Sequence, residues 1–333
     1  MLKVAVIGAG SIGRHHVRNY HEIPNVDLVG VSDVNEAQAA QVAGAFGNTP
    51  HFADFESMLT EVKPDLVSIC VPTQNHYEVA KIVISHGINL LIEKPISETV
   101  EQARDLIALA ENAGVKLTVG HIERFNPAVI ELKKHLDEKR LGKVFRIQAR
   151  RMGPFPARIR DVGVVIDLAT HDLDMIRYVL DDEIVRLYAE TAQGINTDRE
   201  DIMDCVLRTS GNVIGMLNIN WMTPTKIREL SIIGARGMYT VNYLTQDLYF
   251  YENDVIDDRW DTLGILTGVG EGNVTKFRLS RQEPLRAELE HFISAVQNNN
   301  TPLVTGEDGL KALMLANALV QSGIDRKVAH FDA

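Results

Sequence analysis

Short apolar segments alternate with helical segments throughout the first third of the chain, and this pattern constrains the fold more than any other feature. The apolar segments have the character of strands at residues 3–7, 27–32, 66–71, 88–92 and 116–119, and the helical segments lie at residues 12–22, 35–46, 77–85 and 100–112. Strands that alternate with helices predict a parallel sheet that helices cover on both faces. We therefore expect an N-terminal α/β domain with a doubly wound parallel sheet.

The pattern changes after residue 140. Strand-like segments lie at residues 143–151, 183–192, 202–207, 213–221 and 226–233, with turn signals at 210–212 and 234–237, and helices are expected at 285–297 and 309–321. Consecutive strands joined by short turns predict an antiparallel sheet. A chain of 333 residues is long enough for two domains. We place them at residues 1–121 and 122–333, the second an α+β domain with a large open antiparallel sheet, and allow the last helix to pack back on the first domain.

The charge and the cysteine count exclude several classes of protein. Lysine and arginine number 34 against 45 aspartates and glutamates, which gives a formal charge of −11. Nucleic acids and anionic membranes are bound by basic surfaces, and no apolar stretch reaches the roughly 18 residues of a membrane span. Two cysteines are too few for a disulfide framework, and no signal peptide is recognisable. We expect a cytoplasmic protein that binds no nucleic acid, membrane or metal.

A glycine-rich loop follows the first predicted strand. It contains Gly8, Gly10, Ser11, Ile12 and Gly13, in the pattern G-x-G-x-x-G. The first glycine allows a tight turn, the second lets a pyrophosphate approach the backbone, and the third lets the helix pack close to the strand. The start of the helix supplies free N–H groups and a dipole that favour an anion. Between a strand and a helix, this loop predicts a dinucleotide site.

Asp33 follows the second predicted strand, 20 residues after Gly13. A carboxylate at this place hydrogen-bonds the ribose hydroxyls of NAD. The same charge repels the 2′-phosphate of NADP, and no arginine occurs among residues 34–36. The sequence therefore favours NAD over NADP. The alternative is that Asp33 caps the following helix, a task for which Asn35 also qualifies.

The segment Glu93-Lys94-Pro95 follows the strand at residues 88–92. The carboxyl ends of the strands in a doubly wound sheet border the ligand crevice, so Lys94 is a candidate for proton transfer beside the nicotinamide. The alternative is an ordinary solvated lysine.

A second group of polar residues lies on a helix predicted over residues 163–180. At about 100° per residue, Val165, Ala169, Leu173, Ile176 and Leu180 form an apolar stripe, and Asp167, His171 and Asp174 lie nearly opposite. Asp167 and His171 are i,i+4 neighbours, so the carboxylate can orient the imidazole. Such a histidine can accept the proton of a hydroxyl group. The alternative is an exposed ion pair; a metal site with Asp172 and Asp174 is disfavoured because consecutive helical residues point in different directions.

Four arginines lie within residues 150–160, on a segment bent by glycine and proline. They are Arg150, Arg151, Arg158 and Arg160. Guanidinium groups bind phosphates and carboxylates bidentately, so the cluster is a candidate site for an anionic substrate such as the diphosphate of a nucleotide sugar. The alternative is a solvated loop whose arginines pair with nearby acids.

These motifs together resemble the glucose–fructose oxidoreductase, inositol dehydrogenase and MocA (Gfo/Idh/MocA) family. The glycine loop, Asp33, Glu93-Lys94-Pro95 and Asp167-x-x-x-His171 occur in the order seen in that family, and the resemblance covers nearly the whole chain. It implies a Rossmann domain followed by a domain with a large open antiparallel sheet. It also implies NAD(P)-dependent oxidation or reduction of a sugar or cyclitol, and a homodimer or homotetramer formed through the C-terminal sheet.

The resemblance also implies roles for single residues. Lys94 matches the catalytic lysine of the family, and Asp167 and His171 match its acid–histidine pair. The residues that would line the cofactor, besides the glycine loop and Asp33, are Pro72, Thr73, Asn75, His76, Glu93, Lys94 and His121.

Two finer segments, residues 120–127 and 158–168, resemble the branch of the family that acts on UDP-amino sugars. They imply that Arg124, Asn126, Arg158 and Arg160 bind substrate together with Lys94, Asp167 and His171. The expected reaction is oxidation of the 3-hydroxyl of UDP-N-acetylglucosamine by NAD. The alternatives are the corresponding uronic acid, a free sugar or inositol, and a non-catalytic NAD-binding regulator.

Overall fold

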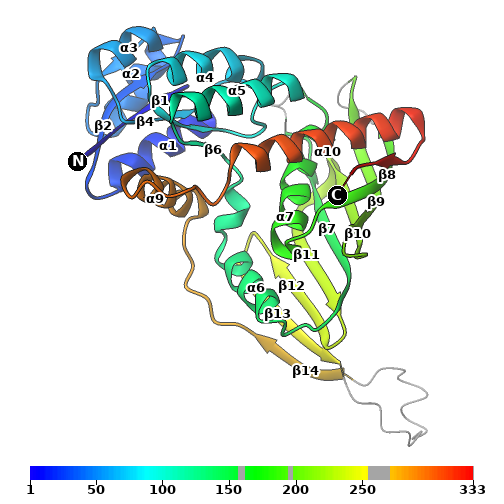
Figure 1. The fold of residues 1–333 in the computed structure, drawn as a ribbon. Helices are drawn as coiled ribbons and strands as arrows, with labels where there is room; N and C mark the ends of the chain where they lie inside the picture. The colour runs from blue at the N-terminus through cyan, green and yellow to red at the C-terminus, as the bar shows by residue number, and fades with distance from the viewer. Residues whose placement is uncertain (157–161, 194–197, 254–270, 333) are drawn as a thin grey trace, which may run out of the picture. The chain divides into compact units, whose positions relative to one another are not determined.

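The computed structural model describes residues 1–156, 162–193, 198–253 and 271–332, and it divides the chain into two compact units (Figure 1). The first unit comprises Met1–Phe125 and Glu283–Met314, and the second comprises Asn126–Gln282 and Leu315–Ala333. Our division had a single boundary after residue 121. Residues 283–314 belong to the first unit because the apolar face of helix α9 (Pro284–Gln297), with Leu289 and Phe292, packs into that unit's core.

The first unit is built on a six-stranded parallel sheet. Its strands are β1 (Leu2–Ile7), β2 (Val26–Ser32), β3 (His51–Phe52), β4 (Leu66–Ile69), β5 (Asn89–Ile92) and β6 (Leu117–Val119), in the order β3-β2-β1-β4-β5-β6. This order places a switch point between β1 and β4, where dinucleotides bind in such sheets. Each strand predicted here is present, and β3 is an addition that pairs through only two residues.

Helices cover both faces of this sheet, as the alternating pattern predicted. Helices α1 (Ser11–Glu22), α2 (Glu36–Ala45) and α9 pack on one face. The other face carries α3 (Phe55–Val62), α4 (His76–Ser85), α5 (Val100–Ala113) and the first part of α10 (Gly306–Asp325). A short 3-10 helix, η1 (Thr73–Asn75), precedes α4, and another, η2 (Ile122–Phe125), ends the unit's first segment. The doubly wound α/β fold is confirmed.

The second unit contains a nine-stranded mixed sheet. Its strands are β7 (Val144–Pro154), β8 (Ile184–Gln193), β9 (Glu200–Thr209), β10 (Ile214–Asn220), β11 (Met222–Gly234), β12 (Gly237–Asn242), β13 (Asp247–Asn253), β14 (Glu271–Lys276) and β15 (Ala329–His330), in the order β14-β13-β12-β11-β7-β10-β9-β8-β15. Strands β7 and β10 are parallel. All other neighbouring strands of this sheet are antiparallel, as predicted; β7 and β10 are the exception, and a helix and two further strands separate them along the chain.

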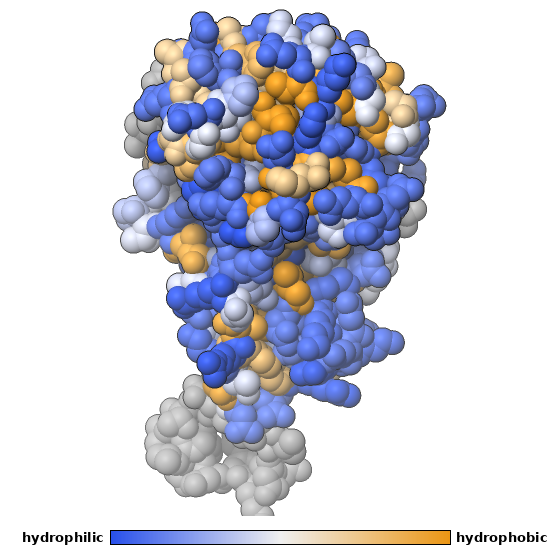
Figure 2. Space-filling model, turned by 90° about the vertical axis from the view of Figure 1, so that its left-hand side faces the viewer, coloured by the Kyte–Doolittle hydropathy of each residue, from blue (hydrophilic) through white to orange (hydrophobic). Residues whose placement is uncertain are grey.

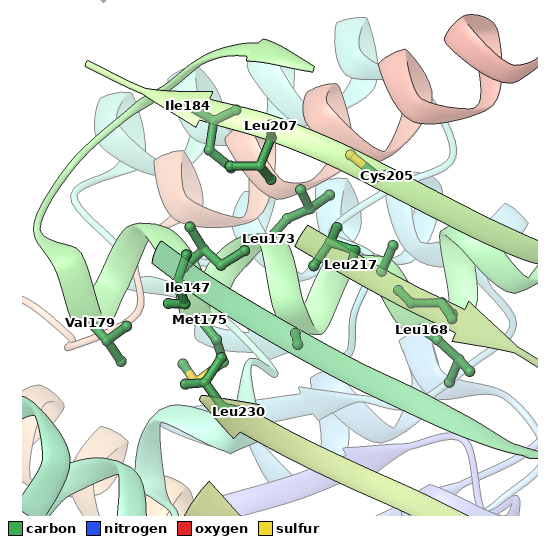
Figure 3. Packing of buried hydrophobic residues seen from close by; sticks show 14 of the residues in the cluster. Ile147, Leu168, Leu173, Met175, Val179, Ile184, Cys205, Leu207, Leu217 and Leu230 are labelled. Carbon is green, nitrogen blue, oxygen red and sulfur yellow. The ribbon is translucent and has the colours of Figure 1, made fainter. Parts of the chain in front are cut away.

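Helices α6 (Pro127–Asp137), α7 (Thr170–Leu180) and the last part of α10 pack against the second sheet. Figure 3 shows side chains of α7 and of the strands, among them Leu173, Leu207 and Leu217, gathered in one cluster. These three helices all contribute to this one cluster, on one face of the sheet. The opposite face carries no helix from the described residues.

The surface is mostly hydrophilic on the side that Figure 2 shows, where hydrophobic residues gather in separate patches. Within the described ranges, every helix is too short or too polar to cross a membrane.

Candidate active site

The glycine loop lies at the carboxyl end of β1, and each glycine meets a different steric demand. Gly8 has a φ of +97°, and a Cβ there would lie 2.6 Å from the carbonyl oxygen of Cys70. A Cβ on Gly13 would lie 1.8 Å from the carbonyl oxygen of Gly8, so the start of α1 can approach β1 only through glycine. A Cβ on Gly10 would meet nothing within 4 Å. The backbone at Gly10 is therefore open to a ligand, as a pyrophosphate requires.

Asp33 is fixed beside this loop by two backbone donors. Its Oδ2 accepts from the Ala9 N–H at 2.8 Å, and its Oδ1 accepts from the Asn35 N–H at 2.9 Å. Asn35 caps α2 by accepting from the N–H of Gln38, so the cap is not Asp33. A carboxylate offers about four acceptor positions, which leaves Asp33 able to bind two ribose hydroxyls.

The end of β4 leads into η1, where the predicted cofactor-lining residues separate into two groups. Pro72 and Asn75 are exposed and Thr73 is half-buried, so a cofactor can reach them. His76 is only 1% exposed. Its Nδ1 lies 2.8 Å from the carbonyl oxygen of Pro95, and its Nε2 lies 2.9 Å from that of Val71. These contacts give His76 a different task from the one we expected: its ring contacts backbone at two strand ends.

The Glu93-Lys94-Pro95 segment directly follows β5. Lys94 is half-buried, and the Lys94–Pro95 peptide bond is cis. The carboxylate of Glu93 accepts a hydrogen bond from the N–H of Lys94 at 3.3 Å. Gly120 follows β6, and a Cβ there would lie 3.0 Å from the same carboxylate. Because Gly120 has no side chain, the carboxylate of Glu93 can lie against the backbone at the end of β6. His121 follows Gly120 and is buried.

Glu93 has a buried partner that sequence reasoning missed. The Nε2 of His16, on α1, lies 2.9 Å from Oε1 of Glu93. Burial acts to raise the pKa of Glu93, but the hydrogen bond and charge of His16 and the charge of Lys94 outweigh it and lower that pKa. The available signal was spacing, because His16 lies three residues after Gly13 and one before Val17, on the face of α1 that is buried.

A second buried acid, Glu288 on α9, lies in the same unit. It is 2% exposed, and neither carboxylate oxygen has a hydrogen-bond partner among the described residues. Burial and, to a lesser degree, the charge of Glu93 raise the pKa of Glu288 well above its ordinary value. Burial of Glu288 therefore favours its neutral form.

In the second unit, Asp167 and His171 lie on the predicted helix, but its first part is not a regular α-helix. A π turn, η3 (Val165–Ala169), contains Asp167, and His171 lies in the first turn of α7. The carboxylate of Glu200 accepts from the N–H of Val165 at 3.2 Å at the start of this segment. Asp167 and His171 are half-buried, and single π turns are frequent at functional sites.

Two of the four clustered arginines are engaged in ion pairs of the second unit. Arg151 makes a bidentate pair with Asp172, at 2.9 and 3.0 Å, and both side chains are buried. Arg150 pairs with Glu229 at 3.0 Å on the surface. Arg158 and Arg160 lie outside the described residues.

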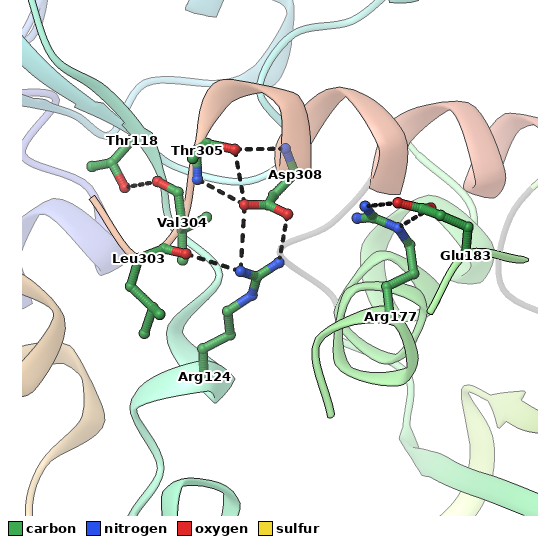
Figure 4. Close-up of polar contacts among 8 residues, drawn as sticks. All are labelled: Thr118, Arg124, Arg177, Glu183, Leu303, Val304, Thr305 and Asp308. Atoms are coloured by element: carbon green, nitrogen blue, oxygen red, sulfur yellow. Dashed lines mark hydrogen bonds and ion pairs between the residues drawn. The ribbon is translucent and has the colours of Figure 1, made fainter. Parts of the chain in front are cut away.

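Arg124 and Asn126 have structural contacts that account for their presence. The guanidinium of Arg124 pairs with Asp308 at 2.9 Å and donates to the carbonyl oxygen of Leu303 at 3.0 Å (Figure 4). Asn126 caps α6 through the N–H of Ala128 and donates to the carbonyl oxygen of Tyr243 at 3.1 Å. Both side chains are buried, so we do not retain them as substrate ligands.

Two family models match most of the chain. Residues 2–121 match the model described as the oxidoreductase family with an NAD-binding Rossmann fold, and residues 129–240 match the GFO/IDH/MocA C-terminal domain. The chain belongs to the Gfo/Idh/MocA family of oxidoreductases. The predicted family, the predicted fold class and the prediction of NAD as cofactor are thereby confirmed.

Relatives within the Gfo/Idh/MocA family match over almost the full length. UDP-N-acetylglucosamine 3-dehydrogenase of Acidithiobacillus ferrooxidans is 29% identical over 315 residues, 95% of each chain. Inositol 2-dehydrogenase of Rhizobium meliloti is 27% identical over 339 residues, 98% of each chain. A solved structure of the Acidithiobacillus enzyme, 28% identical, superposes with a TM-score of 0.85 and covers 96% of this chain and 97% of its own. The protein is an NAD-dependent dehydrogenase of the kind that oxidises CH–OH groups of sugars or inositols.

Proposed function

We propose that this dehydrogenase oxidises the 3-hydroxyl of UDP-N-acetylglucosamine and releases the 3-keto sugar. The observation that carries the proposal is the position of Lys94, half-buried directly after β5 of an NAD-binding Rossmann sheet. The ends of such strands border the ligand crevice. The choice of substrate is supported by the similarity to UDP-N-acetylglucosamine 3-dehydrogenase along 95% of both chains.

Oxidation of the alcohol to a ketone removes a proton from the 3-hydroxyl oxygen and a hydride from C3, the carbon that bears it. Lys94 polarises the 3-hydroxyl, and His171 takes its proton while Asp167 orients the imidazole. NAD⁺, when bound, accepts the hydride. In the alternative assignment, Lys94 is the base and His171 only a hydrogen-bond partner.

The diphosphate of the substrate needs cationic partners. Arg124 is committed to Asp308, and Arg151 to Asp172. The proposal therefore assigns the diphosphate to Arg158 and Arg160, which the sequence places in the segment before Asp167. Guanidinium groups suit this task because they bind phosphate bidentately.

A second candidate substrate is a free sugar or an inositol, which the similarity to inositol 2-dehydrogenase over 98% of each chain favours. Under this alternative, replacing Arg158 and Arg160 has no effect on turnover, and UDP does not inhibit. UDP-N-acetylglucosaminuronic acid is the related alternative that would also need the two arginines.

The experiment that tests the proposal is NADH formation with a panel of UDP-N-acetylglucosamine, its uronic acid, glucose and myo-inositol. We expect turnover with the first, and a loss of about 10² to 10⁴ in kcat for Lys94→Ala and for His171→Ala, the range for a proton-transfer group. Lys116→Ala is the matched control, because Lys116 is also half-buried but precedes β6 at the opposite end of the strands. Unchanged turnover in both variants contradicts the assigned roles.

We further propose that the protein forms a homodimer or homotetramer through the second sheet. Strand register places five apolar residues in one row on the face that bears none of the described helices, with Arg146 of β7 between the first two: Ile214, Ile233, Met238, Tyr251 and Val274. Contiguous exposed apolar surface marks association sites, and a second copy of the chain presents the same face. In size-exclusion chromatography, Ile233→Glu should elute as a monomer. Wild-type elution of this variant would contradict the proposal.

A further inference from the structure

Two buried histidines contact the residues on either side of Lys94. His16, on α1, is 0% exposed, and its Nε2 lies 2.9 Å from Oε1 of Glu93, the residue before Lys94. His76, at the start of α4, is 1% exposed, and its Nδ1 lies 2.8 Å from the carbonyl oxygen of Pro95, the residue after Lys94. The two histidines come from helices that pack on opposite faces of the first sheet.

The contact between His16 and Glu93 fixes a carboxylate whose second oxygen is also engaged. Oε2 of Glu93 accepts from the N–H of Lys94 at 3.3 Å. The side chain of Glu93 is 19% exposed, so part of it remains at the open edge of the sheet. A buried histidine thus holds a carboxylate that in turn holds the backbone of Lys94.

His76 links this segment to the neighbouring strand. Its second ring nitrogen, Nε2, lies 2.9 Å from the carbonyl oxygen of Val71, which follows β4. A neutral imidazole has one N–H and donates to one of these two oxygens. Burial lowers the pKa of His76 more than its backbone contacts raise it, so the neutral form is favoured.

We propose that His16 and His76 are positioning residues that together hold the Glu93–Lys94–Pro95 segment and thereby aim the amine of Lys94. The inference rests on the proposed function, because it presupposes that Lys94 touches the reacting hydroxyl. Polar side chains that are fully buried are costly unless they are hydrogen-bonded, and these two contact the immediate neighbours of the half-buried Lys94. An error of about 1 Å in placing such a group reduces the rate by up to about 10²-fold.

Replacing a histidine by asparagine or glutamine can distinguish the contact made by Nδ1 from the contact made by Nε2. The amide of glutamine reaches the place of Nε2, and the shorter amide of asparagine reaches the place of Nδ1. The contact that matters is made through Nε2 in His16 and through Nδ1 in His76. Glutamine should therefore preserve activity better than asparagine at position 16, and asparagine should preserve it better than glutamine at position 76.

The test measures kcat, the KM for NAD⁺ and the apo-protein reactivity of the Lys94 amine. We expect His16→Asn and His76→Gln to lower kcat by about tenfold to 10²-fold. The KM for NAD⁺ of these two variants should change less than about threefold. In His16→Gln and His76→Asn, kcat should stay within about threefold of the wild-type value. In the cofactor-free protein, the acylation rate of Lys94, measured by mass spectrometry relative to Lys116, should change in the first two variants only. The thermal midpoint of each variant shows that it is folded.

His135→Gln is the matched control for a buried histidine that pairs with a glutamate. His135 is 1% exposed, and its Nε2 lies 3.0 Å from Oε1 of Glu131, but it belongs to the second unit. We expect wild-type kcat and wild-type Lys94 acylation for this variant.

Two results would overturn the inference. One is wild-type kcat and acylation in all four amide variants while Lys94→Ala is inactive, which would leave the role of Lys94 intact. The other is that the same amide, glutamine or asparagine, gives the higher kcat at both positions. A fully active Lys94→Ala would instead overturn the proposed function.

Discussion

The two units carry their candidate residues in different ways. In the first unit, Gly8, Asp33, Pro72, Lys94 and His121 each follow a strand of one parallel sheet. Because the carboxyl ends of parallel strands share one edge, a position directly after a strand is also a position at the site. In the second unit, the candidate residues lie on a helix and in the segment before it. The topology of this unit provides no comparable rule by which the position of a residue in the sequence predicts that it lies at a site.

This difference also shows in how the arginines are used. The cluster at residues 150–160 looked like one anion site, yet Arg150 and Arg151 lie next to each other on β7 and have different partners. Side chains alternate between the two faces of a strand, so Arg151 pairs with Asp172 in the buried layer and Arg150 pairs with Glu229 on the open face. Clustering in sequence therefore does not imply a common ligand.

The largest effect is expected at the buried pair of the second unit. Asp172→Ala leaves the Arg151 charge buried without its carboxylate and should destabilise the protein by about 3–5 kcal/mol. Arg150→Ala removes the exposed pair with Glu229, whose side chains are 45% and 43% exposed, and should cost at most about 1 kcal/mol. Chemical denaturation of both variants measures the difference. Equal losses would show that burial does not separate the two arginines.

The next effect concerns the glycine loop of the first unit. Gly13→Ala places a Cβ 1.8 Å from the carbonyl oxygen of Gly8, so α1 must move away from β1. We expect NAD⁺ affinity to fall by about 10²-fold, equivalent to roughly 2.7 kcal/mol. Gly44→Ala, at an exposed position of α2 where a Cβ would meet only Oδ1 of Asn48 at 3.9 Å, is the control. Calorimetric titration with NAD⁺ gives both dissociation constants, and wild-type affinity in Gly13→Ala would show that the close approach is dispensable.

A smaller effect is expected at Asp33. Asp33→Asn removes the charge that we assign to binding of the ribose hydroxyls, and hydrogen bonds to charged groups contribute about 1.5–3 kcal/mol. The KM for NAD⁺ should rise by about tenfold or more, and the preference for NAD⁺ over NADP⁺ should fall. Asp27→Asn, at an exposed position near the other end of β2, should change neither value. An unaltered preference in Asp33→Asn would contradict the assignment of this residue.

The last prediction concerns the pH dependence of stability in the first unit. Burial raises the folded-state pKa of Glu288 well above 4.5, so the folded protein binds this proton more tightly than the unfolded chain does. Stability from this group is therefore full below the unfolded pKa and is lost as the pH rises toward the folded pKa. Glu288→Gln should raise the thermal midpoint more at about pH 8 than at about pH 5. An equal shift at both pH values would show that Glu288 is not held neutral.

The fold of the first unit and its cofactor could be predicted from the sequence because the information is local. The loop from Gly8 to Gly13, Asp33 and Lys94 needed only the strand that precedes each of them. His16 and Glu288 were missed because their significance depends on long-range contacts, with Glu93 for His16 and through the return of α9 to this unit for Glu288. His76 was predicted to line the cofactor, whereas its burial and its contact with Pro95 could not be read from spacing.

In the second unit, periodicity found the helix over residues 163–180 and its apolar stripe, but not its π turn. Strands β12, β13, β14 and β15 and helix α6 were not predicted, and neither was the parallel pairing of β7 with β10. Arg124 illustrates the remaining difficulty. Its motif suggested a substrate ligand, whereas its partner Asp308 lies 184 residues away in the chain.

The most direct test of the proposed reaction is the fate of the hydrogen on C3 of the sugar. UDP-N-acetylglucosamine deuterated only at C3 is incubated with the enzyme and NAD⁺, and both products are analysed by mass spectrometry and NMR. The proposed function predicts that the deuterium appears on C4 of the reduced nicotinamide and that the sugar carries a 3-keto group. Reduced cofactor without deuterium, or turnover only with inositol or free sugars, would contradict it.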